Sequence, residues 1–290
     1  MGYRHIDNLY KNQEILNLEE CFALEKIHGT SAHVSIKLVQ GKPEVKFFSG
    51  GSKYETFLEN FNAEQLKTTF SESELTNVII YGESYGGKCQ GMSATYGKVL
   101  KFVAFEVKID DVWLNVPDAE AMVEKFGLEF VAYERIKTDL KSIDAERDRP
   151  SRQAKRNGIE EDKIAEGVVL RPIIETRNYR GNRILCKHKR DEFMETKTPR
   201  KVDPEKQKIL ENARDIAIEW VTPMRLEHVL DKIENISMEN MREIIGRMVE
   251  DVKREGEGEI VWSKQVASAI GKTTAQLVKQ RFQKELQNGK

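Results

Sequence analysis

Alternating hydrophobic and polar residues mark several short segments in the first two thirds of the chain. Successive side chains of a β-strand point to opposite faces, so this alternation is typical of half-buried strands. Short continuous apolar runs are typical of strands that are buried on both faces. Together the two patterns predict strands at 33–39, 45–48, 77–82, 100–109, 167–170 and 183–187.

The intervals between the predicted strands differ in character. Residues 57–70 and 118–126 are predicted to be helical. Residues 137–163 are polar and charged with little periodicity, and we expect them to form a surface excursion. Strands interleaved with helices, without regular βαβ repeats, predict a mostly antiparallel α+β domain.

The last ninety residues carry a helical pattern throughout. Apolar residues fall on one face of each predicted helix, as Ile209 and Ala213 do in the first. Capping residues mark the four helix starts, and two of them precede proline. These residues are Asp203, Thr222, Ser237 and Ser263. Gly256 ends the third helix, and Gly271 is a candidate interruption of the fourth. The pattern predicts a separate all-helical domain over residues 203–290.

The composition narrows the class of protein. The chain of 290 residues has 47 basic and 48 acidic residues, so its net charge of −1 creates no global positive field. Cys21, Cys89 and Cys186 are odd in number and far apart, which argues against a disulfide framework or a zinc site. No apolar run approaches the roughly 20 residues of a membrane span, and no secretory signal is recognised. We therefore expect a cytoplasmic protein with no membrane partner.

The familiar nucleotide-binding motifs are missing. Gly271-Lys272-Thr273 resembles the end of a phosphate-binding P-loop, but Val266 stands where that motif requires glycine. The glycine-rich dinucleotide fingerprint, the zinc-protease motif and the serine-nucleophile elbow do not occur either. Nucleotide chemistry by these routes is therefore unsupported.

Lys26 has an unusual setting for a surface lysine. It ends an apolar strand and precedes a polar turn that contains Gly29. One interpretation is a nucleophilic amine, which attacks an electrophile once burial or neighbouring cations favour its neutral form. The other is a hairpin with solvated charges, because isolated lysines near turns are common. This segment alone favours the second interpretation.

Four further segments change that balance. The five segments, in chain order, are Lys26–Ser31, Tyr81–Gly87, Phe102–Val107, Glu166–Val169 and Lys187–Lys189. Each is weak by itself. In this order and at these spacings they resemble motifs I, III, IIIa, IV and V of the covalent nucleotidyltransferases, which include RNA ligases, DNA ligases and mRNA-capping enzymes.

The resemblance implies both a fold and a chemistry. The fold is α+β: a nucleotidyltransferase domain of the ATP-grasp-like ligase kind, with antiparallel sheets and helices over residues 1–200, precedes the small all-helical domain. ATP is the implied donor, with Mg²⁺ or Mn²⁺ as cofactor. Lys26 is implied to form lysyl-AMP, Lys187 and Lys189 to contact the α-phosphate, and Glu166 to hold the metal. The residues implied to bind ATP are Glu25, Lys26, Ile27, His28, Glu83, Phe105, Glu166, Lys187 and Lys189.

Several of these side chains also have an ordinary interpretation. Lys187 and Lys189 alternate on a strand and can share a face, where they bind a phosphate or are simply solvated. Glu83 accepts hydrogen bonds from ribose hydroxyls or caps the next turn. Phe105 stacks on the adenine ring or belongs to the core. Glu166 holds a divalent metal or forms a surface salt bridge.

The residues around the lysine indicate the branch of the superfamily. DNA ligases and capping enzymes usually carry aspartate two residues after the lysine, where this chain has His28. The sequence Glu-Lys-Ile-His-Gly-Thr at 25–30 resembles the RNA ligase 2-like family, and so does a helical continuation in place of an oligonucleotide-binding barrel. One departure is the arginine that this family usually has about twenty residues later. Lys46 and Lys53 are the basic residues there, and lysine lacks the bidentate fork of arginine.

The sequence therefore predicts an ATP-dependent RNA ligase that seals 3′-hydroxyl and 5′-phosphate RNA ends in RNA repair, with a nicked duplex as one candidate substrate. Local basic clusters agree with an RNA partner, although charge balanced across the fold is the alternative. The clustered residues are Arg171, Arg177, Arg180, Arg183, Lys187, Lys189, Arg190, Lys197, Arg200, Lys201, Lys279, Arg281 and Lys284. The rival functions are another covalent nucleotidyltransferase, either a DNA ligase or a capping guanylyltransferase, and a non-catalytic RNA-binding protein on a ligase scaffold.

Overall fold

A computed structural model describes residues 3–178, 181–193, 204–231, 233 and 236–287. Contacts group the chain into two units, which we call the sheet unit and the helical unit and describe separately. The sheet unit consists of residues 1–9, 21–175 and 185–199. The helical unit consists of residues 10–20, 176–184 and 200–290. Two segments from before residue 200 therefore group with the C-terminal helices.

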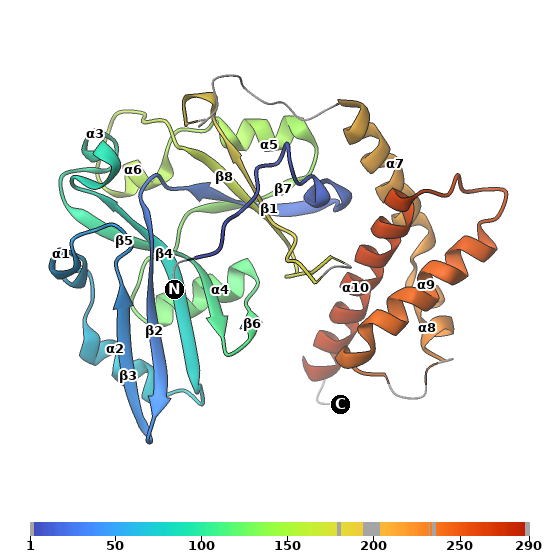
Figure 1. Ribbon diagram of the computed structural model, residues 1–290, viewed down its shortest axis with the longest axis horizontal. Coiled ribbons are helices and arrows are strands. Elements are labelled where there is room, and N and C mark those ends of the chain that lie inside the picture. Colours follow the sequence, from blue (N-terminus) through green and yellow to red (C-terminus); the bar gives the residue numbers. More distant parts are fainter. Residues whose placement is uncertain (1–2, 179–180, 194–203, 232, 234–235, 288–290) are drawn as a thin grey trace. The chain divides into compact units, whose positions relative to one another are not determined.

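Two antiparallel sheets form the frame of the sheet unit (Figure 1). One sheet has the strand order β7-β1-β8-β9, and the other has the order β3-β2-β4-β5-β6. The strands of the first are β1 Glu20–Lys26, β7 Tyr133–Lys137, β8 Gly167–Pro172 and β9 Cys186–Lys189. Those of the second are β2 Thr30–Val39, β3 Lys42–Phe48, β4 Asn77–Gly86, β5 Leu100–Ile109 and β6 Val112–Trp113. The mixed α+β fold with antiparallel sheets is confirmed.

Six α-helices complete the sheet unit within its described residues. They are α1 Tyr54–Leu58, α2 Ala63–Ser71, α3 Ser93–Tyr96, α4 Val116–Lys125, α5 Leu140–Arg147 and α6 Arg152–Arg156. Phe57, Phe70 and Val123, from α1, α2 and α4, share one hydrophobic core with Val34 of β2 and Val107 of β5. These buried apolar side chains hold the helices against the larger sheet.

The structure confirms some predicted elements and corrects others. The strand predicted at 100–109 has these bounds as β5, whereas the strand predicted at 183–187 begins only at Cys186. The single helix predicted at 57–70 is wrong: two helices form, because the Asn62 side chain accepts a hydrogen bond from Gln65 N and caps α2. The surface excursion predicted at 137–163 is also wrong. It contains α5 and α6 and buries Ile143 completely.

The helical unit has its own hydrophobic core, in which α7 to α10 all take part. Its α-helices are α7 Pro204–Trp220, α8 Pro223–Leu230, α9 Met241–Glu255 and α10 Lys264–Gln287, and the 3₁₀ turn η1 spans Glu14–Asn17. Thr222 caps α8 as predicted, by accepting from Arg225 N, while the predicted cap Asp203 lies outside the described residues. Gly271 does not interrupt α10. Within the described ranges, no helix combines the length and hydrophobicity needed to cross a membrane.

Candidate active site

Lys26 lies at the end of β1, where β1 meets the start of β8. The two strands pair antiparallel, with Lys26 opposite Gly167. Gly167 has a positive φ of 143°, and a β-carbon there would lie 2.1 Å from the carbonyl oxygen of His188 on β9. Only glycine permits this close approach. Because β8 pairs with both β1 and β9 at Gly167, Lys26, Glu166 and β9 lie close to one another.

Glu166 is the centre of a charged cluster. One carboxylate oxygen, Oε2, lies 2.9 Å from Lys26 Nζ and 3.0 Å from His28 Nδ1. The other, Oε1, lies 2.9 Å from Lys189 Nζ. Burial by itself raises the pKa of Glu166, but the hydrogen bonds and charges of His28, Lys26 and Lys189 outweigh it and lower the pKa to about 2. Glu166 is therefore a buried carboxylate that stays ionised.

Glu83 is the second carboxylate of this region, and its ionisation differs. Burial raises its pKa to about 7, with Glu166 adding to the rise and Lys26 opposing it. Its carboxylate also accepts a hydrogen bond from the backbone of Gly29. A β-carbon at Gly29 would lie 2.3 Å from the Ser84 carbonyl oxygen, so the close approach of this turn to β4 requires glycine.

Glu25 has structural partners on both oxygens. Its Oε1 accepts from Ser151 Oγ at 2.6 Å, and its Oε2 accepts from the backbone nitrogens of Arg152 and Gln153 at 2.9 and 3.1 Å. These donors lie at the start of α6, in the segment that was predicted to be a surface excursion. Burial raises the pKa of Glu25, and these hydrogen bonds oppose the rise. The structure thus ties β1, next to Lys26, to α6.

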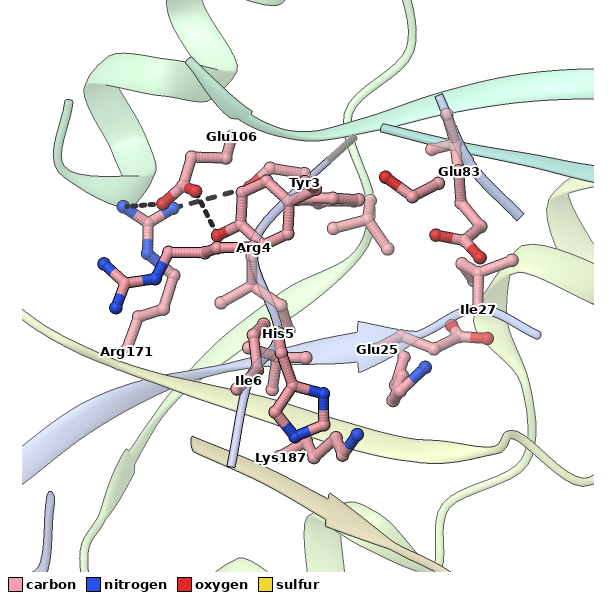
Figure 2. A pocket seen from close by; sticks show the side chains of 17 residues that line it. Tyr3, Arg4, His5, Ile6, Glu25, Ile27, Glu83, Glu106, Arg171 and Lys187 are labelled. Atoms are coloured by element: carbon pink, nitrogen blue, oxygen red, sulfur yellow. Dashed lines mark hydrogen bonds and ion pairs between the residues drawn. The ribbon is translucent and has the colours of Figure 1, made fainter. Parts of the chain in front are cut away.

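A pocket of about 230 Å³ is lined by residues of both sheets, Lys26 among them. Figure 2 shows this pocket with Glu83 on one side and Glu106 on the other. Of the nine residues predicted to bind ATP, six line it: Glu25, Lys26, Ile27, Glu83, Phe105 and Lys187. His28, Glu166 and Lys189 do not line it, but all three join the charged cluster around Lys26. The structure thus brings the nine predicted residues into one region of the sheet unit.

The side chains of residues 187–189 point alternately to the two faces of β9. Lys187 lines the pocket, and Lys189 contacts Glu166. Between them, His188 Nε2 lies 2.7 Å from Asp144 Oδ1 on α5. Burial lowers the pKa of His188, and the hydrogen bond to Asp144 opposes that shift. This contact anchors the middle of β9 to α5 while its neighbours face the site.

The sequence patterns gave no signal for residues 3–6 in this pocket. Tyr3, Arg4, His5 and Ile6 run along it, and Figure 2 shows Tyr3 beside Glu106 and Arg171, on the opposite side from Glu83. The Tyr3 hydroxyl donates to Glu106, and its ring packs edge-on against Phe105 with centroids 5.0 Å apart. Ser31 was also missed as a separate residue, although it lies opposite Glu83 in the β2–β4 pair and lines the pocket.

The basic segment 171–201 does not form one exposed face. Arg171 is buried and pairs with Glu106 and Glu175 at 3.1 Å each, and Arg183 is buried in the helical unit. Burial removes these two arginines from an exposed RNA-binding surface. Four further members of the predicted cluster lie outside the described residues: Arg180, Lys197, Arg200 and Lys201.

A divalent metal would find few protein ligands here. The described residues contain no group of three or more His, Cys, Asp or Glu side chains arranged to hold one. Glu166 offers an ionised carboxylate, but both of its oxygens are engaged by cations. Mg²⁺ commonly binds through one or two carboxylates together with substrate phosphates and water. Glu166 is therefore the residue that would hold a divalent metal here, together with the phosphates of a bound nucleotide.

Comparison with known proteins identifies a family for the part of the chain that contains these residues. A model of the RNA ligase family matches residues 19–189, which is more than half of the chain and spans Lys26, Glu83, Phe105, Glu166 and Lys189. Among curated proteins, none is similar enough in sequence to count as a match.

Solved structures of Naegleria gruberi RNA ligase are similar to this chain at a low level. A mutant of that ligase with ATP and Mn shares 13% identity at a TM-score of 0.49, over 67% of this chain and 57% of the other. The same ligase with PPi shares 16% sequence identity at a TM-score of 0.47, again over 67% of this chain and 57% of the other. An apo mutant shares 14% identity at a TM-score of 0.47, over 74% of this chain and 58% of the other. The chain thus spans less than two thirds of the length of these structures.

Proposed function

The chain belongs to the RNA ligase family, and from that membership and the Lys26 cluster we propose that it is an ATP-dependent RNA ligase. It seals RNA ends that carry a 3′-hydroxyl and a 5′-phosphate. The observation that carries this proposal is the convergence of Lys26, His28 and Lys189 on Glu166, at one end of a pocket that Glu83 and Phe105 line. A cytoplasmic location stays a prediction.

In the first step, the ammonium group of Lys26 gives a proton to solvent, and the resulting amine attacks the α-phosphorus of ATP. A bond forms between Lys26 Nζ and phosphorus, the bond to the bridging oxygen breaks, and pyrophosphate leaves as the amine loses a proton. The product is lysyl-AMP. Glu166 holds the amine at the pocket before the nucleotide binds. Lys187 and Lys189 neutralise charge on the α-phosphate as it develops in the transition state.

The same residues support the two later steps. A 5′-phosphate oxygen of the RNA attacks the phosphorus of lysyl-AMP, which frees Lys26 and forms an RNA-adenylate. The 3′-hydroxyl then attacks the activated 5′-phosphate, loses its proton and releases AMP as the phosphodiester forms. Glu166 is the residue that would hold Mg²⁺ or Mn²⁺, whose charge would neutralise the phosphates in each step.

The nucleoside end of the site is defined by Glu83 and Phe105. Glu83 accepts hydrogen bonds from the ribose hydroxyls in this proposal, and Phe105 stacks on the adenine ring. Ile27, which follows β1, supplies an apolar contact, and Glu25 positions the end of β1 through its hydrogen bonds to the start of α6. Because residues 3–6 also line the pocket, its volume lies below the roughly 300 Å³ at which small-ligand pockets usually begin. ATP binding is therefore expected to displace part of this segment.

The test is self-adenylylation. The protein is incubated with magnesium and ATP labelled at the α-phosphate, and labelled GTP is used in parallel. A labelled band that survives denaturing electrophoresis from ATP, and that is lost in Lys26→Ala, is the expected result. Lys67→Ala is a matched control, because Lys67 is a helical surface lysine paired only with Glu64 among the described residues.

The rival functions give different results. A band from GTP alone would indicate a capping guanylyltransferase. No band from protein that mass spectrometry shows to be free of AMP would contradict the proposal and favour a non-catalytic RNA-binding protein. Sealing of a nicked DNA duplex in preference to a nicked RNA duplex would favour a DNA ligase.

A further inference from the structure

The helical unit contains a buried lysine that the proposed reaction does not use. Lys272 lies on α10 and is 4% exposed. Its ammonium group has three donors, and within the described part of the chain its hydrogen bond is a long one of 3.4 Å to the Glu14 carbonyl oxygen. Burial lowers the pKa of Lys272 to about 8, although Glu14 opposes the shift. A buried amine with unused donors indicates a place for an acceptor from outside.

That amine lines a pocket of about 500 Å³ within the helical unit. The pocket lies within the range of about 300–1,000 Å³ that is usual for small-ligand sites. Its basic lining residues are Arg177, Lys264 and Lys272, and no acidic side chain lines it among the described residues. Lys264, Ser268 and Lys272 follow one another at four-residue intervals on α10, so they share one helix face. The charged wall of the pocket therefore suits an anion.

The opposite wall is apolar. Ile245 and Val249 of α9 line it, one helical turn apart, and both are half-buried. Figure 1 shows α9 beside α10 in the helical unit. A β-carbon on Gly271 would lie 3.1 Å from Ile245 Cγ2, which shows how closely the two helices approach next to the pocket. A ligand that fits both walls has a phosphate at one side and a flat apolar surface at the other.

We propose that this pocket binds one nucleotide of the RNA substrate, with a phosphate on Lys272 and Lys264 and the base against Ile245 and Val249. The proposal rests on the proposed RNA ligase activity for the identity of its ligand. Gly271-Lys272-Thr273 thereby acquires a role other than that of a P-loop. In the middle of α10 the backbone N–H groups are engaged in the helix, so the phosphate contacts come from side chains.

The experiment measures RNA binding by the full chain. The anisotropy of a fluorescent single-stranded RNA is followed at several salt concentrations in EDTA, which prevents turnover. Lys272→Met is expected to weaken binding about tenfold, because a charge-assisted hydrogen bond to a phosphate is lost. It is also expected to reduce the slope of log affinity against log salt by about 0.7, the contribution of one phosphate in a single strand.

Three further variants separate binding from folding. Lys272→Arg restores a cation and is expected to recover most of the affinity, whereas Ala267→Leu fills the pocket and is expected to weaken binding with all charges kept. Lys208→Ala removes an exposed lysine of α7 that does not line the pocket, and is expected to bind RNA as the wild type does. Circular dichroism confirms that each variant is folded.

The outcomes separate this proposal from the proposed function. Unchanged affinity and salt slope in folded Lys272→Met would overturn the pocket as an RNA site, even if lysyl-AMP forms normally. A loss in Lys208→Ala equal to that in Lys272→Met would overturn it too, because the effect would then be general charge. Failure of self-adenylylation would instead contradict the ligase activity and leave the binding result to stand on its own.

Discussion

The sheet unit and the helical unit each bury a lysine, and they treat its charge in opposite ways. The Lys189 side chain is 7% exposed and lies 2.9 Å from the ionised carboxylate of Glu166. Lys272 is as deeply buried, but faces a backbone carbonyl oxygen at 3.4 Å. A buried charge is tolerated when it is paired, and is costly when it is not. The comparison teaches that the Glu166 cluster is electrostatically complete without a ligand, whereas the Lys272 pocket is not.

The largest change in stability is expected when Glu166 is removed. Glu166→Ala leaves Lys189 buried without its carboxylate and is expected to lower the free energy of unfolding by about 3–5 kcal/mol. The wild-type contribution is present above pH 4.5 and is lost as the pH falls toward 2, because folding lowers the pKa of Glu166. Urea unfolding at pH 7 measures the difference. Glu161→Ala, at an exposed acid paired with Lys163, is the control, and an equal effect of both changes would refute the cluster's structural role.

Removal of Lys272 is expected to change the free energy of unfolding in the opposite direction, as a gain in stability. The folded state lowers its pKa from 10.5 to about 8, so the unfolded state binds more protons in that interval and wild-type stability rises from pH 8 to 10.5. At pH 7, Lys272→Met is therefore expected to raise the free energy of unfolding by about 3 kcal/mol. The gain disappears above pH 10.5. A destabilised Lys272→Met at pH 7 would show that the amine is already well paired in the free protein.

A stability change of similar size is expected from Glu83, the second carboxylate near Lys26 in the sheet unit. Its pKa is raised to about 7 in the folded state, so its contribution to stability is full below pH 4.5 and is lost as the pH rises through 7. At pH 8, Glu83→Gln is expected to be more stable than the wild type by about 3 kcal/mol, and at pH 4 equally stable. Urea unfolding at the two pH values checks this. A pH-independent difference would mean that Glu83 keeps its ordinary pKa.

Local patterns were sufficient where a segment's structure depends on its own side chains. The apolar run at 100–109 predicted β5 with its bounds, since residues on both faces of this strand are buried. Thr222 and the apolar face behind it likewise predicted α8. The motif around Lys26 was found in the same way, because the residue types and their order are properties of the chain itself.

Segments whose partners are distant in sequence were predicted poorly. The 137–163 segment looks polar, yet it contains α5, which Asp139 caps locally, and α6, whose start Glu25 holds through Ser151 Oγ and two backbone nitrogens. The sequence pattern of the segment cannot predict that contact, because Glu25 lies outside the segment. Arg171 was predicted to belong to a basic surface, but it forms a buried ion pair with Glu106.

The sequence by itself determined the α+β class, the C-terminal helices and the set of residues around Lys26, because these depend on periodicity, capping and the order of motifs. Only the tertiary structure decided how their charges are balanced. It placed Glu166 in contact with Lys26, His28 and Lys189, raised the pKa of Glu83 by burial, laid residues 3–6 along the pocket and left Lys272 facing a carbonyl oxygen. The physical reason is that burial and electrostatic pairing depend on distances in space, which connect residues more than a hundred positions apart in the chain.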